Sequence, residues 1–219
     1  MVHPDYYKNT INILLMNMMI FGMNILPGLL LPKFITIHDY GIYKSFYLYV
    51  TTITLMQFGL IEGVNIIYGG KKFSNIEIKD IQSKLTFIFI IELSLTLILL
   101  LLNIVMFKSI VFTLFILMVL PYNIYNFIIN IFTSTASFKE YIKSNLLRNL
   151  LFNICIILII ILKVDIVYLF LLDIILFYFM IMFMLKISRI KVNFYFSNIK
   201  DNMKIIKFGS IILLANYLN

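Results

Sequence analysis

Long apolar blocks, separated by short polar segments, dominate the chain and set its expected architecture. A helix needs roughly 20 mostly apolar residues to cross the hydrocarbon core of a membrane. Blocks of this length run over residues 9–31, 41–68, 84–107, 110–136, 146–163 and 166–186. The pattern therefore predicts an all-α, polytopic membrane bundle of six transmembrane helices, with a kink expected at Pro27 in the first.

A further apolar block begins near Ile205 and stops at Asn219. Fifteen helical residues rise only about 22 Å, less than a hydrocarbon core of roughly 30 Å. We therefore expect the sequence to stop inside a seventh helix. The predicted organisation is a six-helix transmembrane lobe over 1–186, a basic cytoplasmic inter-lobe loop over 187–204, and the start of a truncated seventh transmembrane helix over 205–219.

Composition excludes a soluble domain. The chain is 62% hydrophobic and 13% charged, with a mean hydropathy of +1.01, whereas soluble domains are about half apolar and about a quarter charged. The net charge of +8 comes largely from lysines between apolar blocks, so it indicates contact with anionic lipid headgroups rather than nucleic acid.

The basic residues also predict an orientation. If the six blocks all cross the membrane, 14 of the 18 Lys and Arg residues lie on the side that holds the N terminus, Lys84 and Arg148 among them as loop residues. The positive side of a membrane protein faces the cytoplasm. We therefore expect a multi-pass protein of the cytoplasmic membrane with its N terminus inside. The spans themselves then contain almost no cation.

Polar residues within the predicted spans form stripes when they are placed at 100° per residue. Thr51, Thr54, Phe58, Glu62 and Asn65 share a face of the second span, and Gln57 falls off that face. Glu92, Thr96 and Asn103 align in the third span, and Asn123, Asn126, Asn130 and Thr133 align in the fourth. Asp173 is a lone carboxylate in the sixth.

Amides and hydroxyls often do no more than join helices in a membrane bundle, by hydrogen bonds that average under about 1 kcal/mol. A carboxylate in the membrane is more costly and is more often functional. Several polar stripes together favour a hydrated central cavity and the transport of a polar substrate. The candidate substrate- or ion-binding residues are Glu62, Asn65, Thr51, Glu92, Asn126 and Asn130, whereas Asp173 is expected to be structural.

Motifs of soluble enzymes are missing from the sequence. Gly69-Gly70 is a pair and not a phosphate-binding loop. His3 and His38 have no clustered Cys, Asp or Glu nearby in the sequence, and Cys155 lies inside an apolar block, where it is expected to be a buried hydrophobe. We therefore expect neither an enzyme nor a metal site, and no cofactor.

Two segments resemble the bacterial oligosaccharide flippases, the O-antigen and capsule-type polysaccharide exporters of the multidrug/oligosaccharidyl-lipid/polysaccharide superfamily. One segment joins the Tyr40-Gly41 pair to FGLIEGVNIIYGGKK (58–72), and the other is LPYNIYNFIINIFTSTASFKEYIKSN (120–145). In one branch of the family the second span ends in a pattern like GL-x-DG-I-Y-L-R-YGGK. The matching residues are Gly59, Leu60, Gly63, Tyr68, Gly69, Gly70 and Lys71, with Glu62 in place of aspartate and Ile67 in place of arginine.

The resemblance implies the N-terminal lobe of a two-lobed transporter. Such proteins move undecaprenyl-pyrophosphate-linked oligosaccharides to the outer leaflet by alternating access. The implied partners are the lipid-linked oligosaccharide, membrane lipids, and a polysaccharide polymerase or glycosyltransferases. Two alternatives stay open: a cation-coupled drug exporter of the same superfamily that uses Glu62 or Glu92 as its proton site, and a truncated, non-transporting membrane scaffold.

Overall fold

The computed structural model describes residues 4–191, 193, 195 and 199–218, and every regular element in these ranges is a helix. The all-α class is therefore confirmed. The chain order is α1 (Pro4–Phe34), α2 (Ile37–Thr52), η1 (Ile53–Gln57), α3 (Leu60–Tyr68), η2 (Phe73–Asn75), α4 (Ile78–Leu102), η3 (Asn103–Phe107), α5 (Ile110–Ser134), α6 (Phe138–Leu162), α7 (Val167–Ile187) and α8 (Ile199–Leu218).

Five helical stretches of the described chain are long and apolar enough to cross a membrane: Leu14–Phe34, Ile78–Phe107, Ile110–Ser134, Phe138–Leu162 and Val167–Ile187. A sixth arises if Ile37–Gln57 and Leu60–Tyr68 count as one bent span. The chain is thus a multi-pass membrane protein by the length and composition of its helices. α8 is not among these candidates, and it begins at Ile199, before the expected start at Ile205.

The second span is broken rather than straight. α2 tightens into the 3₁₀ turn η1, and the axis then bends by 58° into α3. Phe58 and Gly59 both adopt left-handed backbone conformations, with φ of 55° and 82°, and such residues end a helix because they cannot continue its hydrogen-bond ladder. α1, by contrast, passes Pro27 and Pro32 as one unbroken helix. The helical path is therefore interrupted at Phe58 and Gly59, and not at Pro27 or Pro32.

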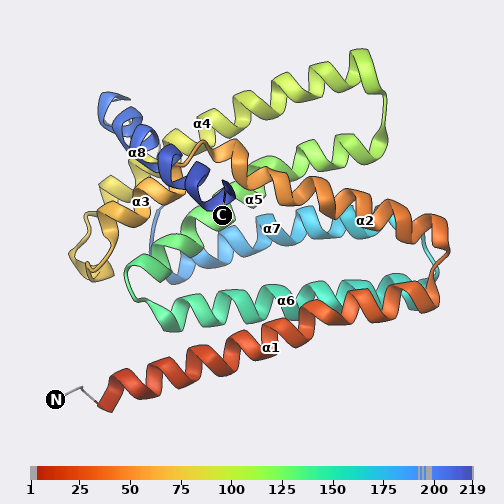
Figure 1. Ribbon diagram of the computed structural model, residues 1–219, viewed down its shortest axis with the longest axis horizontal. Coiled ribbons are helices and arrows are strands. Elements are labelled where there is room, and N and C mark those ends of the chain that lie inside the picture. Colours follow the sequence, from red (N-terminus) through yellow and green to blue (C-terminus); the bar gives the residue numbers. More distant parts are fainter. Residues whose placement is uncertain (1–3, 192, 194, 196–198, 219) are drawn as a thin grey trace.

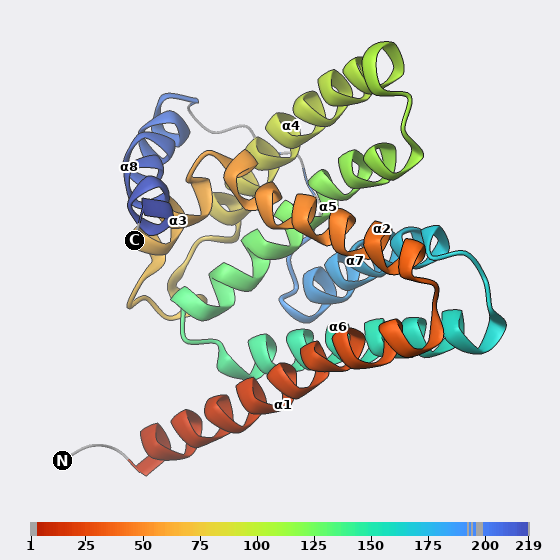
Figure 2. The ribbon, with the colours of Figure 1, turned by 45° about the vertical axis from the view of Figure 1, so that its right-hand side comes forward.

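α5 is the central helix, and it packs against α2, α3, α4, α6 and α7. Figures 1 and 2 show α4 and α5 as a long antiparallel hairpin, and α1 lying along α6 at the edge of the bundle. α2 is fixed across α7 by a stacked pair, Phe46 and Phe170, whose ring centroids are 3.9 Å apart. Large stacked aromatics of this kind fill the core that positions the polar side chains.

Two basic residues that were expected in loops lie inside helices. Arg148 belongs to α6, which starts at Phe138 rather than at 146. Lys84 belongs to α4, which starts at Ile78, and its side chain is buried and paired with Asp80. Counting these two residues with the loops was wrong, because each already lies at the start of its apolar block (84–107 and 146–163). Polar first turns extend both helices further toward the N terminus, so an apolar-block criterion starts these helices too late.

The polar segment after α7 is tied to α4. The side-chain amide of Gln82 donates to the carbonyl of Lys191 (2.7 Å), and the backbone N–H of Tyr195 donates to the Thr86 hydroxyl (3.3 Å). The predicted inter-lobe loop therefore lies beside α4 at Lys191 and Tyr195. Residues 199–204 of that loop belong instead to α8, and residues 192, 194 and 196–198 lie outside the described chain.

Candidate functional site: a polar cavity beside a buried ion pair

The predicted polar stripes of the second and fourth spans meet at a cavity of about 450 Å³. Four of the candidate residues line it, two from α3 and two from α5. η1 and α8 complete the wall. The lining residues are Thr54, Gln57, Ile61, Glu62, Asn65, Tyr122, Asn126, Asn130 and Leu213.

An amide ladder connects the two helices across this cavity. The Asn65 side chain donates to the Asn130 carbonyl oxygen (Oδ1, 3.1 Å), and the Asn130 amide in turn donates to the backbone carbonyl of Asn126 (2.9 Å). The Asn65 Oδ1 atom is buried and accepts no hydrogen bond from the protein. The ladder fixes the positions of the side chains and leaves an acceptor for a ligand donor.

Glu62 has Gln57 as its partner, a residue that the helical wheel placed on another face. The Gln57 amide donates to Glu62 Oε1 at 3.4 Å, a long and therefore weak bond. The prediction for Gln57 was wrong because the wheel assumes one continuous helix, whereas the chain breaks at Phe58 between the two residues. The second carboxylate oxygen of Glu62, Oε2, is buried without a hydrogen bond.

Two other candidates do not line the cavity. The Thr51 side chain is exposed and donates to the Leu48 carbonyl of its own helix (2.6 Å). Glu92 is fully buried in α4 beside the Asn123 side chain of α5, and within the described chain neither carboxylate oxygen makes a hydrogen bond of good geometry. The same holds for the hydroxyl of Thr96, one turn along the helix. Glu92 is thus a second, separate polar feature of the bundle.

A buried ion pair joins α2, α6 and α7. Arg148 Nη2 lies 3.0 Å from Asp173 Oδ1, and the Tyr47 hydroxyl donates to Asp173 Oδ2 at 2.8 Å. The guanidinium also stacks over the rings of Phe152 and Phe177, at 5.1 and 4.6 Å from their centroids. These contacts balance a carboxylate that is 0% exposed.

The expectation of almost no cation within the spans was therefore wrong for Arg148. Asp173 is structural in the sense predicted, because it pairs with a cation of the neighbouring helix and joins three helices. No helical-wheel pattern links positions 148 and 173. The available signal was a lone carboxylate facing a basic residue across one predicted hairpin, a pairing that is common for ionisable residues inside membranes.

The family-like motif residues have structural positions. The Tyr68 hydroxyl donates to Asp80 Oδ2 (2.8 Å), which holds the end of α3 against α4, and the Lys84 ammonium lies over the Tyr68 ring. Gly69 caps α3, and Gly70 has a φ of 77°, which a glycine adopts without strain. Lys71 is exposed just beyond this turn.

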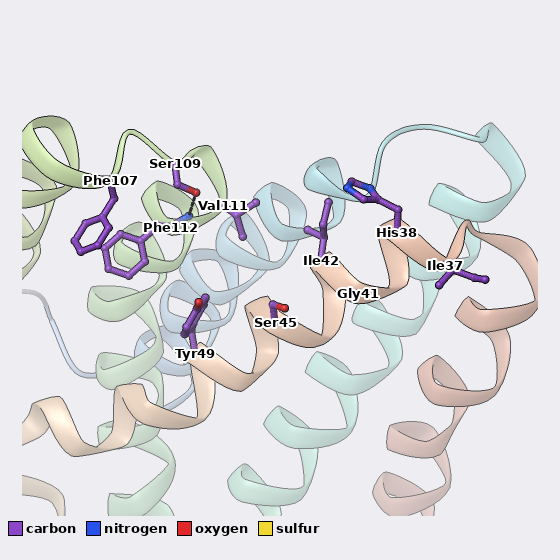
Figure 3. Close-up of a pocket in the computed structure, with 10 residues that line it drawn as sticks. All are labelled: Ile37, His38, Gly41, Ile42, Ser45, Tyr49, Phe107, Ser109, Val111 and Phe112. Atoms are coloured by element: carbon purple, nitrogen blue, oxygen red, sulfur yellow. Dashed lines mark hydrogen bonds between the residues drawn. The ribbon is translucent and has the colours of Figure 1, made fainter.

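A second hollow, of about 680 Å³, lies at the other end of α2 (Figure 3). It lies between α2, from Ile37 to Tyr49, and the turn that joins η3 to α5, with Phe107 and Phe112 on the side away from Ile37. The neighbouring Tyr40 stacks on Tyr43 (6.1 Å). The mainly apolar walls of this hollow suit a lipid chain better than a polar group.

Comparison with protein families, with curated proteins and with solved structures finds no match to this chain. Among the described residues, no group of three or more His, Cys, Asp and Glu side chains is placed to hold a metal ion. The amides, carboxylate and hydroxyls of the cavity wall therefore define what the cavity can bind.

Proposed function

We propose that the chain is a lobe of a membrane transporter that moves undecaprenyl-pyrophosphate-linked oligosaccharide across the cytoplasmic membrane by alternating access. The observation that carries this proposal is the cavity between α3 and α5, whose wall holds three asparagines, Glu62 and Tyr122 inside a strongly apolar bundle. Amides and carboxylates match the hydroxyl donors and acceptors of a sugar, and an aromatic ring suits its apolar face.

The positions of the basic side chains favour different places for the sugars and for the pyrophosphate of the substrate. Within the described part of the cavity wall there is no Lys or Arg side chain, and the buried Arg148 is neutralised by Asp173. The cavity therefore suits the neutral sugars. In this proposal the pyrophosphate stays near Lys71 and Lys72, which are exposed just beyond α3, and the lipid tail remains in the bilayer.

A cation-coupled drug exporter is the second candidate, and Glu92 is the observation that favours it. A fully buried carboxyl that makes no well-formed hydrogen bond within the described chain is the kind of group that exchanges a proton in a transporter. Glu92 does not, however, reach the cavity wall. A polar, amide-rich cavity also fits a sugar better than an apolar drug.

The test is export in the cell of origin. Glu62→Gln and Asn130→Leu should each lower the transfer of lipid-linked oligosaccharide to the outer leaflet at unchanged protein abundance. Glu77→Gln is the matched control, because Glu77 is exposed and lies at the start of α4, outside the cavity. Normal export in both cavity variants would overturn the proposal. Loss of drug efflux when the Glu92 carboxylate is removed would favour the second candidate.

A further inference from the structure

α8 packs on α3 (Figures 1 and 2), and three glycines, Gly59, Gly63 and Gly209, lie at the closest approach of the two backbones. A Cβ atom at Gly209 would lie 2.6 Å from the backbone nitrogen of Gly63 and 2.8 Å from the carbonyl carbon of Gly59. A Cβ at Gly63 would meet Ile205 of α8 at 2.5 Å. Distances this short are not tolerated, so the two backbones can touch only because all three residues lack side chains.

This close approach is specific to one pair of helices. Gly22, Gly28 and Gly41 have no atom within 4 Å of where a Cβ would lie. Gly59 caps the start of α3, and the Gly63 N–H donates to its carbonyl (3.0 Å), so the two glycines lie one turn apart and form a small-residue surface of the kind on which membrane helices pack closely. The family-like glycines of FGLIEG thus form the seat of α8.

The seated α8 contributes an apolar side chain to the wall of the polar cavity. Ile205, Gly209 and Leu213 are spaced by four residues and form the buried stripe of α8. Leu213 lines the cavity together with Glu62. The outward face of α8 is mostly exposed, with Phe208 and Ile211 more than half accessible. α8 therefore packs on α3 along this stripe, and its Leu213 brings an apolar side chain into a mainly polar wall.

Two polar atoms of the cavity wall are left without partners. Within the described chain, Glu62 Oε2 and Asn65 Oδ1 are buried and accept no hydrogen bond. Orphaned acceptors of this kind raise the free energy of the covered state relative to one in which water or ligand hydroxyls reach them. The segment before α8 is meanwhile anchored to α4 through Lys191.

We propose that α8 is a movable lid on this cavity, seated in the Gly59–Gly63 groove and released to admit the polar part of a substrate. The proposal deepens the proposed function and rests on it for the identity of the substrate. The lid can be tested without transport, by measuring how readily a reagent in water reaches a cysteine placed in the cavity.

The experiment measures how fast a membrane-impermeant, hydrophilic maleimide labels Asn126→Cys, a cavity position, in a Cys155→Ser background and in permeabilised membranes. Gly209→Leu places a side chain where only hydrogen fits, so it should unseat α8 and speed the labelling about fivefold or more. Leu213→Ala, which removes the covering side chain and leaves the seat intact, should also speed it. Gly22→Leu is the matched control and should leave the rate unchanged.

General loosening of the bundle is tested with the native thiol. In Gly209→Leu without the added cysteine, labelling of Cys155 on α6 should stay at the parental rate. An unchanged rate at position 126 in both α8 variants would overturn the lid, as would an equal increase in Gly22→Leu or at Cys155. The export measurement on Glu62→Gln tests the proposed function and the labelling rates test the lid. Faster labelling together with normal export would therefore contradict the proposed function and leave the lid in place.

Discussion

Arg148 on α6 and Asp173 on α7 pair at 3.0 Å, and Tyr47 on α2 binds the other oxygen of the same carboxylate. Removing one partner of a buried pair leaves an uncompensated charge, which costs about 3–5 kcal/mol. Arg148→Met should therefore lower the free energy of unfolding by that order, measured by denaturant titration in mixed micelles.

The double variant Arg148→Met/Asp173→Leu serves as the control for this pair. It removes both charges together and should recover most of the stability, because apolar replacements of buried pairs are often neutral. If the two single changes simply add in the double variant, the residues do not interact, and the joining of α6 to α7 has another cause.

Glu92 should be a residue whose removal stabilises the fold. Its carboxylate is fully buried and makes no hydrogen bond of good geometry within the described chain, with only the Asn123 amide beside it, and a buried polar group without a partner costs about 1–3 kcal/mol. Glu92→Met keeps a similar volume and should raise the unfolding free energy by about that amount, in the same micelle titration. Glu62→Met should gain less, because Glu62 Oε1 already accepts a bond from Gln57. Equal or lower stability for Glu92→Met would mean that the carboxylate is paired.

The break in the second span can be tested at Phe58. Its left-handed φ of 55° costs a residue with a side chain about 1–2 kcal/mol, and glycine escapes this cost. Phe58→Gly should therefore be more stable than Phe58→Ala by about 1 kcal/mol, because both lose the ring and only one relieves the backbone. Were the alanine variant the more stable of the two, the segment would be an ordinary helix in the membrane.

The orientation inferred from charge predicts which turns face the outside. In a Cys155→Ser background, Lys163→Cys in the turn between α6 and α7 should react with an impermeant maleimide added to intact cells. Lys139→Cys at the start of α6 should react only after permeabilisation, since both lysines are exposed and differ only in the side of the membrane. The reverse pattern would place the N terminus outside.

The sequence by itself determined the helical, multi-pass architecture, because crossing a membrane requires long apolar helices, and such blocks can be read directly from composition. It also grouped Glu62 with Asn65, and Asn126 with Asn130, because each pair repeats at a spacing of three or four residues within one regular helix. It could not predict what lies across from a helix, nor where regular spacing stops.

Tertiary structure decided the partners. Gln57 meets Glu62 only because the chain turns at Phe58 and Gly59. Arg148 becomes an ion-pair partner of Asp173 only because α6 lies beside α7. Gly59 and Gly63, which read as motif glycines in the sequence, serve to bring the backbone of α8 against α3. Each of these contacts depends on the packing of separate helices, and a periodicity along one helix contains no information about its neighbour.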